Sequence, residues 1–478
     1  MDDILKYYLA NTLATPSVMA GRLTHPITHM RYPERQVFTR LQKYADDFFA
    51  KGTEPRLISL TGLRGTGKTT LLWQTANHIG SRYGQSVYFF NVNTLKNLNI
   101  SLFAALEAFQ QHIVQRRFNE LTAPIVLLFD EVQDDEQWAQ TLKILYDEAK
   151  TAFILCTGSS ALLLNSTADL ARRMFLQRIF PYNFSELLTV QNVVQPALNL
   201  RLPDRQLAEQ LKQIIFYSED AASCHQQLVD IQHEIQPVIH RWQSQLPDLP
   251  ERYINYLNLP NLLFYEDADA IHQNILDLLK RIIYEDIPTL KPAYEDLGKI
   301  EKLMLRLAGS DEINPEKLAG IIGMKQQAIH ELTDLLVKAE LINVLLPFGG
   351  LDSRINKHKK AFFMSPSLRR ALLYSLYGQI LPEQYRSKLR EDAVMMYLKR
   401  VLPENIISFA AGSPTANPDF VIETRERPLV LEVGTHKTST AQARVIPARY
   451  GLLVSDGSDV PLLKENTVQI PFNWFLLL

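Results

Sequence analysis

The sequence predicts an α/β protein whose first part is a parallel β-sheet, and three observations support this prediction. Apolar runs of strand length alternate with helical patterns up to about Phe184. One of these runs, Leu57–Thr61, is followed by a glycine-rich turn and then by a helical stretch. Hydrophobic residues make up 46 % of the 478 residues, which is enough for a large core. Strands separated by helices are typical of βαβ units, whose sheets are buried on both faces.

The composition excludes several classes of protein. The 50 basic and 52 acidic residues give a net charge of -2, so the whole chain is not a basic nucleic-acid coat protein. Two cysteines, Cys156 and Cys224, are too few for a disulfide scaffold or a cysteine-rich zinc module. No run approaches the ~20 apolar residues of a membrane-spanning helix, and the first residues do not resemble a secretory signal. We therefore expect a cytoplasmic protein without zinc and without a membrane anchor.

Changes in pattern along the chain predict four domains. These are a sheet-containing core at 1–182, a helical segment with an insertion at 183–290, a winged helix-turn-helix at 291–387 and a small α/β domain at 388–478. Within 183–290, the residues Gln206–Tyr217 and Ala268–Tyr284 carry apolar positions at helical spacing, and we expect a solvated helix pair between them.

The winged helix is predicted from the order of its elements. A helix starts at Asn314-Pro315-Glu316 and ends at Gly323, and a second helix follows at Lys325–Ala339. The strand-like runs Leu341–Leu346 and Ala361–Met364 then predict a hairpin. Two helices joined by a tight turn and followed by a hairpin are the pattern of a winged helix.

The strongest motif lies directly after the first strand and matches the pattern GxxxxGK[ST] in full. Its glycines let backbone N–H groups point at phosphate oxygens, and the helix that follows adds a favourable dipole. Lys68 supplies positive charge to the β- and γ-phosphates, and the Thr69 hydroxyl is placed to ligate Mg²⁺. We therefore expect ATP and Mg²⁺ as cofactors. The expected nucleotide-binding residues are Gly62, Leu63, Arg64, Gly65, Thr66, Gly67, Lys68, Thr69 and Thr70.

A second motif points to hydrolysis as well as binding. The buried run Ile125–Phe129 ends in Asp130-Glu131. Asp130, at the carboxyl end of a strand, can hold Mg²⁺ through water, and Glu131 can orient and deprotonate the attacking water. Lys68 and Glu131 are therefore the first candidates for catalytic residues.

Two further groups are candidates for contacts with the γ-phosphate. The run Ala152–Cys156 ends in Thr157-Gly158-Ser159-Ser160, where a small polar side chain can sense this phosphate. We favour Ser159, but the sequence does not choose between it and Ser160, and a plain turn is the alternative. Arg172-Arg173 follow a helical pattern; an arginine reaching a neighbour's γ-phosphate raises the rate about 10³–10⁵-fold, whereas most exposed arginines have no such role.

Several segments in order resemble the AAA-type ATPases of bacteria and archaea that carry a C-terminal domain similar to restriction endonucleases. The resemblance implies a P-loop AAA-type sheet, a helical lid at 183–290, a winged helix, a nuclease-like domain at 388–478 and assembly into a homo-oligomer. That family has Leu-Ala-Gly-Arg where this chain has Leu-Ala-Arg-Arg, so its arginine maps to Arg173. The segments that carry the resemblance are Gly62–Thr69, Leu127–Gln133, Thr157–Ala161, Leu170–Arg173 and Phe180–Glu186.

The nuclease-like domain lacks one residue that such nucleases use. They hold Mg²⁺ with a helix glutamate, an aspartate and the glutamate of a Glu-x-Lys strand. By resemblance these carboxylates are Glu391, Asp419 and Glu432, but Gly434 stands at the position of the lysine. A degenerate domain that binds DNA or a partner is therefore favoured over an active nuclease or a purely structural cap. The sequence does not decide whether the three carboxylates still bind a metal, or whether the nearby Lys437 replaces the lysine.

Double-stranded DNA is a candidate partner of the predicted winged helix. The hairpin carries Lys357, Lys359 and Lys360, and the second helix begins with Lys325 and two glutamines, residue types that contact phosphates and base edges. Winged helices also bind proteins. We therefore expect an ATPase that couples its nucleotide state to C-terminal domains associated with DNA or a partner. The alternative is a nucleotide-gated switch with slow hydrolysis that acts through a protein partner in a defence or regulatory complex.

Overall fold

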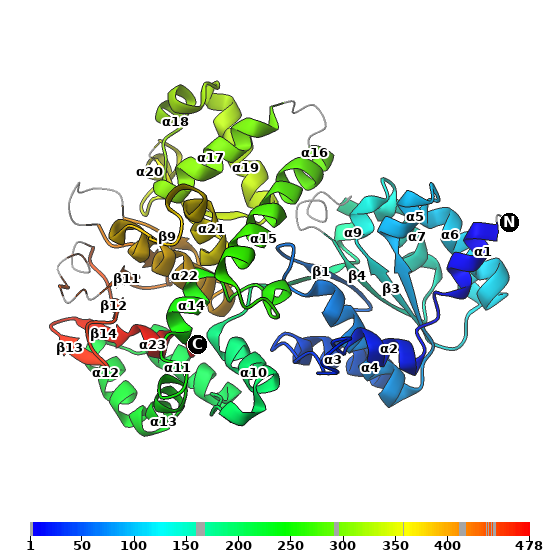
Figure 1. The fold of residues 1–478 in the computed structure, drawn as a ribbon, viewed down its shortest axis with the longest axis horizontal. Helices are drawn as coiled ribbons and strands as arrows, with labels where there is room; N and C mark the ends of the chain where they lie inside the picture. The colour runs from blue at the N-terminus through cyan, green and yellow to red at the C-terminus, as the bar shows by residue number, and fades with distance from the viewer. Residues whose placement is uncertain are drawn as a thin grey trace. The chain divides into compact units, whose positions relative to one another are not determined.

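The computed structural model describes residues 3–158, 168–290, 296–356, 358–410, 417–435, 437, 439–440, 442 and 446–478. The chain divides into two units, which we call unit 1 (Met1–Phe180) and unit 2 (Pro181–Leu478). Figure 1 shows their helices and strands, coloured along the chain. The finer division into four domains stays a prediction.

Unit 1 contains a five-stranded parallel sheet with the strand order β2-β3-β4-β1-β5. Its elements are α1 (Asp3–Ala10), α2 (Pro16–Arg22), α3 (Phe38–Lys51), β1 (Leu57–Thr61), α4 (Lys68–Tyr83), β2 (Val87–Asn91), α5 (Val92–Asn97), α6 (Leu102–Phe109), β3 (Ile125–Asp130), α7 (Trp138–Glu148), β4 (Ala152–Thr157), α9 (Ala168–Ala171) and β5 (Phe175–Arg178).

Both faces of this sheet are buried, as the apolar runs predicted. Along β3, Val126 and Leu128 belong to the core formed with α2, α3 and α4, whereas Leu127 and Phe129 belong to the core formed with α5, α6 and α7. Figure 1 shows these two groups of helices on opposite sides of the strands. The fifth strand, β5, was not predicted, because Phe175 and Leu176 are exposed at the sheet edge and its residues form no apolar run.

Unit 2 begins with helices. These are α10 (Phe184–Val194), α11 (Arg205–Tyr217), α12 (Ala221–Asp230), α13 (Gln232–Gln243), α14 (Leu249–Asn255), α15 (Ala268–Arg281), α16 (Ile287–Leu290) and α17 (Leu297–Gly309). Acidic side chains cap the N-termini of two of these helices. The Asp204 carboxylate accepts a hydrogen bond from the Leu207 N–H at the start of α11, and the Asp267 carboxylate accepts one from the Ala270 N–H at the start of α15.

A three-stranded antiparallel sheet follows, with the order β6-β8-β7. Its segment contains β6 (Glu312–Ile313), α18 (Pro315–Ile322), α19 (Gln326–Lys338), β7 (Ile342–Leu345), α20 (Leu351–Asn356) and β8 (Lys359–Phe363). Asn314 caps α18 and Gly323 ends it in the left-handed conformation at φ 75°, as the sequence predicted. The two strands of the hairpin were also predicted, but the short helix α20 between them was not.

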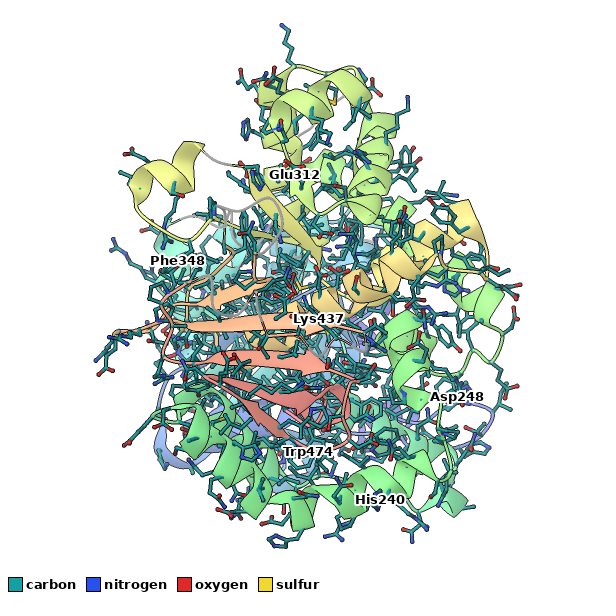
Figure 2. All side chains as sticks on the ribbon, turned by 90° about the vertical axis from the view of Figure 1, so that its left-hand side faces the viewer. His240, Asp248, Glu312, Phe348, Lys437 and Trp474 are labelled. Atoms are coloured by element: carbon teal, nitrogen blue, oxygen red, sulfur yellow. The ribbon has the colours of Figure 1, made fainter. Side chains whose placement is uncertain are left out.

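The last part of unit 2 holds a six-stranded mixed sheet with the order β13-β14-β12-β11-β10-β9. Its elements are α21 (Pro366–Tyr377), α22 (Arg386–Val401), β9 (Ile407–Ser408), β10 (Phe420–Ile422), β11 (Leu429–Gly434), β12 (Gly451–Ser455), β13 (Leu462–Lys464), β14 (Thr467–Pro471) and α23 (Phe472–Phe475). In Figure 2, Lys437 is labelled at this sheet and Trp474 at its lower edge.

The predicted solvated helix pair between α11 and α15 is wrong. Cys224 on α12, Trp242 on α13 and Tyr253 on α14 are fully buried, in one core with the six-stranded sheet. Figure 2 shows His240 of α13 near the red strands of this sheet. Each of these helices is polar on average but buries one apolar side in the core, so its overall composition was misleading.

Buried charges join the two sheets of unit 2. The Arg369 guanidinium on α21 is fully buried and makes two bonds, of 2.6 and 2.9 Å, to the Asp392 carboxylate on α22. Asp392 also accepts from the Phe363 N–H at the end of β8 at 2.8 Å. Burial raises the pKa of Asp392 to about 6 although Arg369 lies against it. The desolvation cost of this pair is therefore large, and its hydrogen bonds connect α21, α22 and the end of β8.

We predict that Arg369→Met strongly destabilises unit 2, because it leaves the Asp392 carboxylate buried without its counter-ion. The expected loss in the free energy of unfolding is about 3–5 kcal/mol. Hydrogen exchange at the amides of β11 and β12 measures this loss. The matched control is Arg386→Met, since Arg386 is half-exposed in its pair with Glu383 and should cost less than about 1 kcal/mol. Equal losses in the two variants would contradict the prediction.

Candidate nucleotide-binding site

The loop between β1 and α4 has a backbone conformation that requires glycine at three positions. Gly62, Gly65 and Gly67 have φ values of 150°, 85° and 84°. Side chains with a Cβ rarely adopt these values. Gly67 is the N-cap residue directly before α4, so the loop ends at a helix N-terminus. This is the geometry in which backbone N–H groups and a helix dipole receive a phosphate.

Gly62 is required for a second reason, which is space. A Cβ at this position would lie 2.3 Å from the carbonyl oxygen of Ile179. The Ile179 N–H in turn donates to the Thr61 carbonyl at 2.7 Å. The chain that leaves β5 is therefore packed directly on the start of the glycine loop.

Lys68 and Thr69 open α4 and point to different partners. The Lys68 ammonium is buried and donates to the carbonyls of Gly62 at 2.8 Å and Leu63 at 3.2 Å, so it lies inside the loop. The Thr69 hydroxyl lies 3.0 and 3.1 Å from the two carboxylate oxygens of Asp130. A buried cation and inward-facing amides suit a polyphosphate, and a hydroxyl beside a carboxylate suits Mg²⁺.

Asp130 is held by the neighbouring strand. β3 and β4 are parallel, with Phe129 opposite Cys156, so Asp130 lies beside Thr157. The Thr157 hydroxyl donates to Asp130 at 2.6 Å and accepts from the Glu131 N–H at 2.9 Å. Burial raises the pKa of Asp130 above its usual value and the charge of Glu131 adds to this shift, whereas the Thr157 and Thr69 hydroxyls oppose it. A divalent cation at this position would favour the ionised carboxylate.

Glu131 follows Asp130 with a left-handed backbone at φ 56°, which is uncommon for a residue with a side chain. Its half-buried carboxylate accepts from the Gln133 amide. Such conformations cost about 1–3 kcal/mol and persist where the surroundings impose them, which here include the Thr157 bond. The backbone therefore turns sharply at the end of β3, and Glu131 follows the residue that contacts Thr69.

The other predicted residues of this site have different outcomes. Leu63 and Thr66 are buried in the loop, while Arg64 and Thr70 are half-buried beside it. Ser159 and Ser160 lie outside the described residues. The Arg173 guanidinium donates to the Asp147 carboxylate on α7 at 2.8 Å and to the Asp169 carbonyl at 2.7 Å, so it is held against unit 1 itself.

Sequence analysis missed two residues near the site. Thr157 was given no role and was treated only as the first residue of a turn. If β3 and β4 had been paired as parallel neighbours, its hydroxyl would have been placed beside Asp130. Arg35 is the second: its guanidinium donates to the carbonyl of Thr66 at 2.7 Å and to the carbonyl of Phe180 at 2.8 Å. No local pattern marks Arg35, because its partners lie 31 and 145 residues away along the chain.

In unit 2, the acidic residues of the predicted nuclease-like domain lie near a lysine. The Lys437 ammonium contacts the side-chain oxygens of Glu432 and Gln442. A Cβ at Gly434 would lie 2.5 Å from the Cβ of Lys437, so the absent side chain leaves room for the lysine stem. The positive charge of Lys437 therefore lies beside Glu432. The sequence had left open whether Lys437 takes the place of the lysine that is absent at position 434.

The carboxylates of this cluster are difficult to ionise. Burial raises the pKa of Glu432 to about 8, with repulsion from Asp419 adding to it and Lys437 opposing it. Burial also raises the pKa of Glu391 and of Asp419. Within the part of the chain that the structure describes, no three His, Cys, Asp or Glu residues are grouped closely enough to hold a metal ion. The residues present do not fit a divalent cation, and we derive no metal-dependent step here.

The comparisons with known proteins agree with the nucleotide site. Residues 54–188 match the model of a family described as an AAA domain, a range that contains the glycine loop, Asp130 and Glu131. Residues 259–375 match a domain of unknown function. The match and the loop geometry together support a nucleotide-binding ATPase with the predicted P-loop AAA-type fold. Over nearly its whole length the chain is similar to an uncharacterised protein of Methanocaldococcus jannaschii, with 29 % identity over 485 residues, 99 % of this chain and 94 % of that protein.

Solved structures of low similarity were also found. The Orc1 protein of Aeropyrum pernix in complex with DNA is 10 % identical and covers 75 % of this chain and 97 % of its own, with a TM-score of 0.31. The Holliday junction branch migration motor RuvB of Thermotoga maritima is 14 % identical over 65 % of this chain and 89 % of its own, with a TM-score of 0.27. TM-scores this low do not establish a relationship with either protein. None of the helices in the described ranges combines the length and apolar character needed to cross a membrane.

We predict that Gly62→Ala disrupts the nucleotide site, because the new Cβ collides with the Ile179 carbonyl and the backbone is strained as well. Unit 1 should lose roughly 2–5 kcal/mol of stability, measured by hydrogen exchange at the amides of β1 and β3. Gly84→Ala is the control: Gly84 also has a positive φ, of 62°, but open space around it, and should cost about 1–2 kcal/mol. Losses of the same size in both variants would show that the contact with Ile179 has no effect.

We also predict that unit 2 loses stability as the pH rises from about 5 to 8. Glu432 has a pKa of about 8 in the folded chain and a usual value of 4.5 when unfolded, so the folded state holds an extra proton in this window. Stability falls with pH wherever the folded state binds more protons. Urea unfolding is followed by the fluorescence of Trp242 and Trp474 in a chain with Trp73→Phe and Trp138→Phe.

In the same chain, Glu432→Gln should flatten this pH dependence, because the amide does not titrate. Glu465→Gln serves as the control, since Glu465 lies on the turn between β13 and β14 and outside the cluster. An unchanged slope in Glu432→Gln would contradict the assignment of the proton to this carboxyl.

Proposed function

We propose that this protein hydrolyses ATP with Mg²⁺ and couples its nucleotide state to unit 2. The observation that carries the proposal is the contact of the Thr69 hydroxyl with the Asp130 carboxylate at the mouth of the glycine loop. Thr69 and Asp130 are the residues that would hold Mg²⁺, Asp130 through water. When bound, Mg²⁺ neutralises charge that develops on the phosphates. Few direct protein ligands are usual for Mg²⁺, which keeps several waters.

Each remaining residue of the site has a role in this proposal. The loop N–H groups bind the phosphates, and Lys68 exchanges its bonds to the loop carbonyls for the β- and γ-phosphate oxygens. Glu131 accepts a proton from the attacking water as the water oxygen bonds to the γ-phosphorus, while the bond from this phosphorus to the β–γ bridging oxygen breaks and ADP leaves. Thr157 supports both acidic residues, because its hydroxyl donates to Asp130 and accepts from the Glu131 N–H.

We propose Arg173 as an arginine that acts on the γ-phosphate of a neighbouring copy in a homo-oligomer. This role requires the Arg173 guanidinium to leave Asp147. A half-exposed ion pair of this kind contributes at most about 1 kcal/mol, so breaking it costs little. The γ-phosphate sensor at Ser159 stays a proposal that rests on the sequence.

DNA is the first proposed partner of unit 2. The order α18, α19, β7, β8 with a three-stranded sheet supports a winged helix. At the start of α19, Lys325, Gln326 and Gln327 are exposed, and such side chains suit phosphates and base edges. Lys359 and Lys360 lie on β8, whereas Lys357 lies outside the described residues.

A protein-directed switch is the second candidate, and the contacts of the hairpin favour it. The Arg354 guanidinium makes two bonds, of 2.8 and 2.7 Å, to the Glu423 carboxylate. The Lys360 ammonium lies 5.4 Å from the centre of the Phe409 ring, and its charge lowers the pKa of Asp419 against the effect of burial. Arg354 and Lys360, one of the lysines expected to contact DNA, therefore make contacts inside unit 2, which reduces the basic surface of the hairpin.

We predict that Glu131→Gln lowers ATP hydrolysis by about 10²–10⁴-fold while ATP binding is retained, because the amide cannot take the proton. Steady-state phosphate release is measured with and without double-stranded DNA, and binding with a fluorescent ATP analogue. Glu136→Gln is the matched control, since Glu136 is exposed five residues further along. Unchanged hydrolysis in Glu131→Gln would refute the proposed mechanism.

The same measurement separates the two candidate partners. Stimulation by DNA that weakens as salt increases supports a DNA-coupled ATPase, because counterion release makes phosphate contacts salt-dependent. Slow hydrolysis that does not respond to DNA supports the protein-directed switch.

A further inference from the structure

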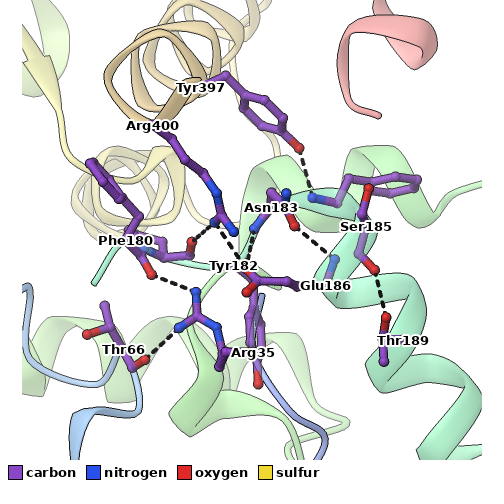
Figure 3. Close-up of polar contacts among 12 residues, drawn as sticks. Arg35, Thr66, Phe180, Tyr182, Asn183, Ser185, Glu186, Thr189, Tyr397 and Arg400 are labelled. Carbon is purple, nitrogen blue, oxygen red and sulfur yellow. Dashed lines mark hydrogen bonds and ion pairs between the residues drawn. The ribbon is translucent and has the colours of Figure 1, made fainter. Parts of the chain in front are cut away.

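The last residues of unit 1 are bound to the nucleotide loop. The Ile179 N–H donates to the carbonyl of Thr61, and Gly62 packs against the Ile179 carbonyl. The buried Arg35 guanidinium then bridges the loop and the end of the unit, with bonds of 2.7 Å to the Thr66 carbonyl and 2.8 Å to the Phe180 carbonyl (Figure 3). Phe180 is the final residue of unit 1.

The first residues of unit 2 are bound equally firmly within that unit. The Arg400 guanidinium on α22 donates to the Pro181 carbonyl at 3.3 Å and to the Glu186 carboxylate at 3.0 Å (Figure 3). The Tyr182 N–H donates to the carbonyl of Asn258 at 2.8 Å. The Phe184 N–H donates to the hydroxyl of Tyr397 at 2.8 Å.

The last residue of unit 1 and the first residue of unit 2 are each held inside their own unit. Two successive carbonyls, of Phe180 and Pro181, are held by arginines that belong to different units. The proline ring fixes its own φ and restricts the residue before it. Because the φ of Pro181 is fixed, only its ψ angle can rotate between the Phe180 carbonyl and the Pro181 carbonyl that is bonded within unit 2.

Arg35 also controls the direction of a phosphate-binding group. In a trans peptide, the C=O of one residue and the N–H of the next point in opposite directions. Holding the Thr66 carbonyl therefore fixes the Gly67 N–H, one of the loop groups assigned to phosphate. A lysine cannot replace Arg35 here, because spanning two carbonyls needs the planar fork of a guanidinium.

We propose that Arg35 is a positioning residue that couples phosphate binding at the loop to the Phe180–Pro181 junction and so to unit 2. The proposal deepens the proposed function and rests on it, since it requires that the loop bind nucleotide. Attraction of the Gly67 N–H by a bound phosphate moves the Thr66 carbonyl, Arg35 follows, and the Phe180 carbonyl shifts with it. The start of unit 2 then responds to the nucleotide through the chain that connects the units.

Hydrogen exchange at residues 181–190 tests this coupling, with and without a non-hydrolysable ATP analogue and Mg²⁺. In the wild-type chain we expect binding of the analogue to change the exchange of the Tyr182 and Phe184 amides by about 5–150-fold, the usual range for coupled sites. Arg35→Lys should lose most of this change, while analogue binding, measured separately, remains detectable.

Two further variants separate coupling from general damage. Arg56→Lys is the matched control: Arg56 is also buried in unit 1 and donates to two carbonyls, of Ala149 and Tyr146, at 2.9 and 2.8 Å. Its partners are not in the nucleotide loop, so the response of residues 181–190 should be kept. Arg400→Lys removes the hold on Pro181 from the other unit and should lose the response with unchanged affinity for the analogue.

The possible outcomes are distinct. A full response in Arg35→Lys, or an equal loss in Arg56→Lys, would overturn the proposal. Binding of the analogue to the wild type without any change at 181–190 would overturn the coupling and leave the proposed ATPase intact. Absence of binding to the wild type would overturn both.

Discussion

The candidate nucleotide site depends on one constraint, the parallel register of β1, β4 and β3. Because these strands run side by side in the same direction, their carboxyl ends lie at one edge of the sheet. Thr61 leads there into the glycine loop, Asp130 ends β3 and Thr157 ends β4. Thr69 and Asp130 lie 61 positions apart and Thr157 and Asp130 lie 27 apart, yet each pair is within hydrogen-bonding distance at this edge.

Buried charge has different roles in the two units. In unit 1, burial raises the pKa of Asp130, and a bound cation would lower it by favouring the ionised carboxylate. This arrangement suits a cationic ligand. In unit 2, Arg369 lies against Asp392 and Lys437 lies against Glu432, and each cation lowers the pKa of its carboxyl against the larger effect of burial. Buried pairs of this kind seldom add stability over an apolar core, but removing one member leaves a costly charge. They therefore specify which helices and strands pack together.

Local patterns predicted the elements that carry their own signal. The strands β1, β3 and β4 of unit 1, the helices α18 and α19, and the strands β7 and β8 follow from apolar runs, a cap and glycine turns. Two kinds of element were not found. The strand β5 has exposed apolar residues at a sheet edge and forms no apolar run. The strands β13 and β14 and the helix α23 are short and were also not predicted, although Asp456-Gly457 marks a turn before them. The final Trp474 and Phe475 are fully buried in the core of unit 2.

The sequence by itself determined the chemistry of the nucleotide loop. Its residues are close neighbours along the chain, so their spacing in the sequence fixes their positions in the loop; they are Gly62, Gly65, Gly67, Lys68 and Thr69. It also determined that Asp130 and Glu131 end a buried strand. Only the tertiary structure decided the partners of these residues: Thr157 beside Asp130, Arg35 between Thr66 and Phe180, and Lys437 against Glu432 where Gly434 leaves room. The physical reason is distance along the chain. Contacts between residues far apart in sequence, and between side chains on different elements, arise only when strand order and packing are fixed, and no local pattern encodes them.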